Sequence, residues 1–97
     1  MAVLPFRKAR RKGPTCRGEL LSLIERDRIV FAIQFARRAS GLLCEVDAQD
    51  VEHLVRTGTA RRDGDRCIVT GTTIEGERAT CIIVLKGRRG TVVEFVV

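Results

Sequence analysis

The side chains best suited to chemistry in this sequence are cations that occur in three short groups. The groups are Arg37 with Arg38, Arg61 with Arg62, and Lys86 with Arg88 and Arg89. Phosphoryl-group chemistry needs positive charge around the phosphate oxygens, together with a group that moves protons. If the three groups converge in the fold, they make one phosphate-binding surface; otherwise they are ordinary solvated charges.

Groups that move protons are scarce in the chain. There is no tyrosine, and the one histidine, His53, falls off the apolar stripe of its segment and is expected to lie in solvent. Glu94 interrupts an apolar segment, so it either faces solvent at a sheet edge or is held beside a basic residue as a functional carboxylate. Arg37, Lys86 and Glu94 are therefore the candidate catalytic set.

Common enzyme and metal motifs are missing from the sequence. It has no Gly-x-x-x-x-Gly-Lys loop, no paired-carboxylate motif and no Cys/His combination suited to nucleophilic catalysis. The four cysteines, at positions 16, 44, 67 and 81, form no Cys-x-x-Cys pair, so zinc-ligand spacing is absent. We expect buried, reduced thiols, the alternative being a disulfide between Cys67 and Cys81. No metal and no cofactor are expected.

The net charge of +6 comes from the first seventeen residues, because residues 18–97 contain as many acids as bases. Residues 1–17 are expected to form a flexible basic arm that binds polyanions; the alternative is a solubilising segment with no partner. The arm residues expected to contact nucleic acid are Arg7, Lys8, Arg10, Arg11 and Lys12. Residues of the domain that would extend this surface are Arg38, Arg61, Arg62, Arg88 and Arg89.

Residues 18–97 are expected to form a single domain. Of the 97 residues, 44% are hydrophobic and 31% are charged, which is typical of a globular protein with one modest core. No apolar segment approaches the roughly 18–20 residues of a membrane helix, and the N-terminus lacks the apolar core of a secretory signal. These features predict a cytoplasmic protein.

Apolar periodicity predicts three helices in the first half of the domain. A stripe of leucines marks the first helix over Gly18–Arg26, and an Asp47 N-cap with Gly58 as the stop marks the third. Between them the β-branched run Ile29–Ile33 predicts a short strand, followed by a second helix over Gln34–Ser40. The alternative is a single long helix that replaces the first two helices and the strand.

The second half of the domain predicts three antiparallel strands, over Arg66–Thr73, Ala79–Lys86 and Thr91–Val97. The middle strand has no polar alternation within Cys81–Leu85, so both of its faces should be covered. The helices can cover one face, which implies that a homodimer or another partner covers the second face. Alternatively, the first helix folds across the second face, or that face stays partly exposed. The expected class is α+β: helix, short strand, two helices and a three-strand meander.

Several segments, taken in order, resemble a known family. They are Ile29-Val30-Phe31, Asp47-Ala48-Gln49-Asp50-Val51, Gly58, Arg66-Cys67-Ile68-Val69-Thr70-Gly71, and the apolar strand Ile82–Leu85 after Gly76-Glu77. The family is unknown-function family 4258, which consists of small bacterial domains similar to the RelE/ParE-like toxins. The match covers about residues 19–97 and implies a RelE-like fold.

The resemblance implies a toxin-type protein that acts on RNA as an mRNA interferase and is neutralised by a cognate antitoxin. RelE-like ribonucleases gather cations around a scissile phosphate on the sheet. Two departures from the family weaken that implication: its histidine is replaced by Gln34 or a neighbour, and its arginine is replaced within Leu42-Leu43-Cys44. The alternatives are a non-catalytic module of the same fold that binds nucleic acid or protein, and a homodimeric structural protein.

Overall fold

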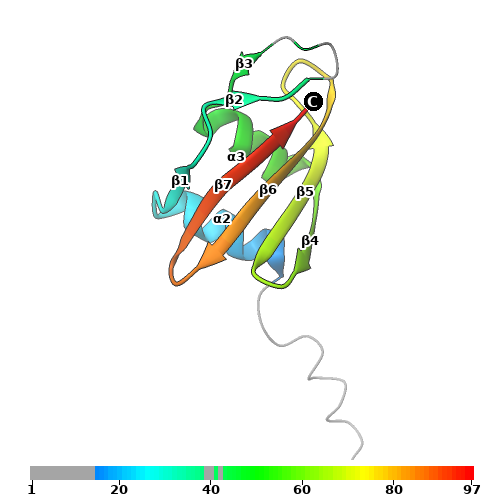
Figure 1. The fold of residues 1–97 in the computed structure, drawn as a ribbon. Helices are drawn as coiled ribbons and strands as arrows, with labels where there is room; N and C mark the ends of the chain where they lie inside the picture. The colour runs from blue at the N-terminus through cyan, green and yellow to red at the C-terminus, as the bar shows by residue number, and fades with distance from the viewer. Residues whose placement is uncertain (1–14, 39–40, 42) are drawn as a thin grey trace, which may run out of the picture.

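A computed structural model describes residues 15–38, 41 and 43–97 and shows an α+β fold (Figure 1). The described residues contain two helices, α2 (Cys16–Glu25) and α3 (Ala48–Thr57). The main sheet consists of β1 (Ile29–Phe31), β4 (Thr59–Asp63), β5 (Arg66–Thr72), β6 (Arg78–Lys86) and β7 (Arg89–Val96). Two short strands, β2 (Phe35–Ala36) and β3 (Cys44–Glu45), form a separate antiparallel ribbon.

The five-stranded sheet has the order β1-β7-β6-β5-β4 and is mainly antiparallel. Strands β4, β5, β6 and β7 form a meander, and β1 joins its edge parallel to β7, with Ile29 opposite Gly90. The predicted α+β class and the antiparallel meander are confirmed. The element order differs from the prediction, because β2 stands where the second helix was expected and β3 and β4 were not foreseen.

The predicted second helix over Gln34–Ser40 is wrong for the described part of that range, and so is the single long helix. After β1 the chain continues beside β7: the Arg37 amide donates to the Phe95 carbonyl, and the Val97 amide donates to the Arg37 carbonyl. Ala36 is only 2% exposed and belongs to the core. Backbone pairing with β7 and burial therefore override the helical propensity of this segment.

Both helices begin at a side-chain cap. Thr15 accepts a hydrogen bond from the Gly18 amide before α2, and Asp47 accepts from the amides of Gln49 and Asp50 before α3. The Asp50 carboxylate in turn accepts from the Asp47 amide, which completes a capping box. The predicted third helix is confirmed. Neither described helix is long and apolar enough to cross a membrane.

Removing the α3 cap is expected to lower the free energy of unfolding by about 1 kcal/mol, because caps of this kind contribute roughly 0.5–2 kcal/mol. In Asp47→Ala the amides of Gln49 and Asp50 lose their acceptor. Urea denaturation followed by circular dichroism measures the loss. Glu45→Ala removes an exposed acid from β3 and serves as the control. Equal losses in the two variants would contradict the capping role.

The core lies between the two helices and one face of the sheet. Leu20 of α2 and Leu54 of α3 are fully buried in one cluster with Val69, Ile83 and Val92 of the strands. Figure 1 shows both helices on the same side of β5, β6 and β7. In the part of the chain that the structure describes, no helix covers the opposite face, which we call the open face.

A β-bulge decides which residues of β7 point to the core. The pairing register shifts between Ile82 and Ile83 of β6, so that Val92 and Phe95 are both buried on the helix side. Strict alternation would put these two residues on opposite sides, because they are an odd number of positions apart. Glu94 is left opposite Ile82, on the open face.

The cysteines differ from the sequence prediction. Cys16 and Cys67 form a disulfide with an S–S distance of 2.04 Å, so reduced thiols are wrong for this pair, and Cys67 is not bonded to Cys81. Cys44 and Cys81 are free. The disulfide joins the start of α2 to β5, a tertiary contact between residues 51 positions apart that local sequence patterns do not reveal.

Burial raises the pKa of the Cys81 thiol from its usual 9.0 to about 12. The unfolded thiol ionises near pH 9, whereas the folded one keeps its proton until about pH 12. The stability that the protonated thiol contributes is therefore fully present below pH 9 and is lost progressively as the pH rises from 9 to 12. We expect urea denaturation at pH 8 and pH 10 to show a larger loss for the native chain than for Cys81→Ala, which cannot ionise. The same loss in both would contradict this assignment.

Candidate nucleic-acid interface

The structure brings together two of the three candidate catalytic residues. Arg37, placed by its backbone pairing with β7, donates to the Glu94 carboxylate and forms an ion pair with it. The side chains are 70% and 36% exposed, so the pair is solvated. Lys86 does not join them: it lies four residues along β6 from Ile82, the partner of Glu94, which corresponds to about 13 Å.

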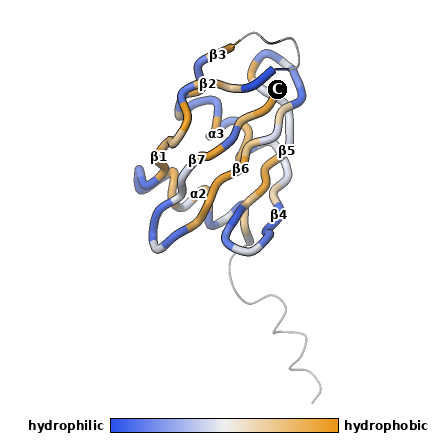
Figure 2. The backbone as a smooth tube through the Cα atoms, in the orientation of Figure 1, coloured by the Kyte–Doolittle hydropathy of each residue, from blue (hydrophilic) through white to orange (hydrophobic). Residues whose placement is uncertain are grey.

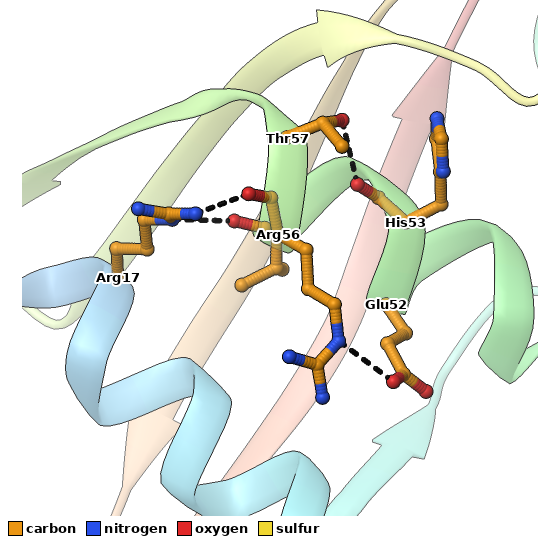
Figure 3. Close-up of polar contacts among 6 residues, drawn as sticks. Arg17, Glu52, His53, Arg56 and Thr57 are labelled. Carbon is orange, nitrogen blue, oxygen red and sulfur yellow. Dashed lines mark hydrogen bonds and ion pairs between the residues drawn. The ribbon is translucent and has the colours of Figure 1, made fainter.

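His53 does not lie beside the Arg37–Glu94 pair. His53 is on α3, on the helix side of the sheet, whereas Glu94 is on the open face. Figure 3 shows the His53 ring directed away from the neighbouring ion pair between Glu52 and Arg56. The His53 contact that the structure defines is structural, because its carbonyl accepts from the Thr57 hydroxyl.

Arg38 is held by an acid and lies in acidic surroundings. It forms an ion pair with Glu77 at 3.0 Å. The hydrogen bond to Glu77, and to a smaller extent the one to Cys44, raises the pKa of the Arg38 guanidinium. Arg38 lines a hollow of about 350 Å³, whose lining also includes the acids Glu45, Asp47, Asp50 and Glu75. Burial raises the pKa of Asp50. With this charge balance the hollow is a poor site for a phosphate.

The predicted pair Arg61 and Arg62 is divided by the fold. Arg62 forms an ion pair with Glu19 of α2 at 2.9 Å, and its Nε donates to the Gly64 carbonyl. Arg61 is exposed on β4, opposite Ile68 of β5. The two side chains therefore lie on opposite sides of the strand, and the three cationic groups do not converge on one phosphate.

Arg17 belongs to the domain. Helix α2 begins at Cys16, so this residue is helical, although the sequence assigned it to the arm. Its guanidinium donates to the carbonyls of Val55 and Arg56 at the C-terminal end of α3, as Figure 3 shows. A cation at this end satisfies carbonyls that have no partner within the helix. The remaining predicted arm residues, Arg7, Lys8, Arg10, Arg11 and Lys12, lie outside the described residues.

The strongest cationic feature is the turn between β6 and β7. Its three basic residues, Lys86, Arg88 and Arg89, are all exposed, and we call them the hairpin cations. None of them makes an ion pair within the described residues. The turn is closed by Gly87 at φ 62°, a left-handed conformation that suits glycine.

Of the hairpin cations, Arg88 lies beside α2. With Gly87 it lines an open hollow of about 470 Å³, and residues of α2 that begin with Gly18 line the rest of that hollow. Arg26 lines it as well, a cation that the sequence did not single out because acidic residues flank it. Thr15, the first described residue, accepts a hydrogen bond from the amide of Gly18, which lines this hollow.

No protein-family model, curated protein or solved structure matches this chain. The resemblance to the RelE/ParE-like toxins therefore stays a prediction. Across residues 15–38, 41 and 43–97, no three His, Cys, Asp or Glu side chains are grouped closely enough to hold a metal ion.

Proposed function

We propose that this chain is a nucleic-acid-binding module of RelE/ParE-like class that binds its target without cleaving it. The hairpin cations carry the proposal, because they are exposed and have no acidic partner in the described part of the chain. The sequence adds five cations at residues 7–12, shortly before the first described residue, Thr15. Phosphate contacts by lysine and arginine supply most of the affinity in binding of this kind.

The arrangement of the other candidates supports binding over catalysis. Cleavage of a phosphodiester needs a proton-transfer group within about 3 Å of the reacting atoms. Lys86 lies about 13 Å along the strand from the nearest candidate carboxylate, Glu94, by the strand rise. Glu94 is itself occupied by Arg37.

A second candidate function is an RNA-cleaving toxin neutralised by a cognate antitoxin. The observation that favours it is the contact between Arg37 and Glu94 on the open face of the sheet. On substrate binding, a phosphate would take the place of the carboxylate beside the guanidinium, and Glu94 would then act as the base. The antitoxin would cover the open face.

Incubation of the purified full chain with RNA, alone and with ribosomes, separates the two functions. We expect a complex in which the RNA stays intact, and we expect K86Q/R88Q/R89Q to weaken that complex at least tenfold, because three phosphate contacts are lost. RNA fragments that disappear in Arg37→Ala and Glu94→Ala would overturn binding without cleavage and support the toxin. No affinity for RNA or duplex DNA at low salt would overturn both.

A further inference from the structure

The open face of the sheet is apolar at its centre. Ile68 of β5 and Ile82 and Val84 of β6 are half-buried side chains on this face, with Val96 of β7 farther along. Figure 2 shows that hydrophobic residues make up much of the length of β5, β6 and β7. An apolar sheet face of this kind marks an interaction surface.

Charges flank this apolar centre in a definite order. Arg61 is opposite Ile68, Ile68 is opposite Ile82, and Ile82 is opposite Glu94. Residues directly opposite on paired strands project from the same face, so these four side chains form one row across β4, β5, β6 and β7. The row reads cation, apolar, apolar, anion.

We propose that the open face binds a second copy of this chain in a face-to-face dimer. The two-fold axis runs parallel to the strands, over the seam between β5 and β6. Rotation about that axis places each Ile68 against Ile82 of the second copy, and each Arg61 against Glu94 of the second copy. The interface is self-complementary, as a two-fold symmetric contact requires.

The order of the row selects this axis over the other face-to-face arrangement. A two-fold axis perpendicular to the strands would place Arg61 against Arg61 and Glu94 against Glu94, and such like-charge contacts cost several kcal/mol. Arg61 makes no ion pair among the described residues, so it can take a new partner. Glu94 has a second carboxylate oxygen beyond the one that Arg37 occupies.

The size of the face indicates a modest affinity. Four strands spaced by about 4.8 Å, with about seven residues each at roughly 3.3 Å per residue, present a face of about 400 Å² per copy. A total near 800–1,000 Å² lies at the small end of specific interfaces. We therefore expect a reversible dimer whose population depends on protein concentration.

Dimerisation goes beyond the proposed function, because it sets the number and direction of the cationic ends. An axis parallel to the strands leaves both copies pointing the same way along it. The two sets of hairpin cations, and the two points where residues 1–14 join their domains, then lie at the same end of the dimer. Two linked sites on one polyanion bind more tightly than either alone.

Charge reversal across the row tests the dimer in sedimentation equilibrium with the full chain. Arg61→Glu and Glu94→Arg should each raise the dimer dissociation constant roughly tenfold or more, because each places two like-charge pairs in the interface. An equimolar mixture of the two variants should recover a heterodimer, since each variant then supplies what the other lacks. The double variant R61E/E94R should also recover the dimer.

Further variants keep the test decisive. Ile82→Glu leaves its side chain in water in the monomer and should abolish the dimer while circular dichroism shows a native fold. Arg88→Glu makes the same charge change off the open face and should leave the dimer intact while weakening nucleic-acid binding. A native chain that stays monomeric at millimolar concentration, or charge variants that dimerise as it does, would overturn the dimer. Neither result would affect the proposed function, which the hairpin variants and the incubation with RNA test separately.

Discussion

Replacing Gly58 by alanine is expected to destabilise the protein by about 3 kcal/mol or more, enough to lower Tm by roughly 12 °C. A Cβ at this position would lie 2.4 Å from the Thr70 carbonyl oxygen and 2.8 Å from that of Leu54. Both contacts are with backbone atoms, which cannot rotate away. The end of α3 would have to move off β5, and the fully buried Leu54 would move with it. Thermal and urea denaturation measure the loss.

Gly76→Ala is the matched control for this clash. Gly76 has φ 93°, and a Cβ there meets no atom within 4 Å, so only the left-handed backbone conformation opposes alanine. That conformation costs roughly 1–2 kcal/mol. Gly58 has φ −96°, which alanine adopts without strain. The larger loss of stability in Gly58→Ala would therefore come from the steric contacts alone. A Gly58→Ala protein as stable as Gly76→Ala would show that α3 and β5 are not in close backbone contact.

The second large effect is expected in the salt dependence of nucleic-acid binding. Each lysine or arginine that contacts a phosphate of duplex DNA adds about −0.9 to the slope of log affinity against log salt. Replacing Arg7, Lys8, Arg10, Arg11 and Lys12 by glutamine should make the slope less steep by about 4–5. K86Q/R88Q/R89Q should make it less steep by about 2–3. Fluorescence anisotropy of a labelled duplex over a salt series measures both.

Arg56→Gln is the control for these charge changes. It removes one cation from α3 that already pairs with Glu52 at 2.8 Å, far from the hairpin in the sequence and held on the helix side of the sheet. Its slope should match that of the native chain. If Arg56→Gln flattens the slope as much per charge as the hairpin variant does, binding follows net charge and has no defined surface.

Features with strong local signals could be predicted from the sequence. The third helix was placed correctly because Asp47 caps it, Val51, Leu54 and Val55 form its buried stripe, and Gly58 ends it. The meander was visible because its strands are long and rich in β-branched residues. These signals need no knowledge of the rest of the chain.

Features that depend on tertiary pairing could not be predicted. Residues 34–38 have helical propensity, yet Phe35 and Ala36 pair with β3, and Arg37 pairs with β7 near the other end of the sequence. The contact of Arg37 with Glu94 was within the candidate set, but the separation of Lys86 from it required the strand register. The link between Cys16 and Cys67 likewise arises from packing of α2 against the sheet. Cations next to acids in sequence, such as Arg26, gave no signal of their place beside the hairpin.

The parallel pairing of β1 with β7 has a consequence for how the chain folds during synthesis. Ile29 emerges from the ribosome about sixty residues before its partner Gly90, so β1 and the apolar side of α2 must wait while the rest is translated. Strand β7 lies between β1 and β6, and the sheet cannot close until it is available. Long-range pairings of this kind slow folding and prolong the exposure of apolar surface. The nascent chain should therefore be a substrate for chaperones until translation has passed Val96.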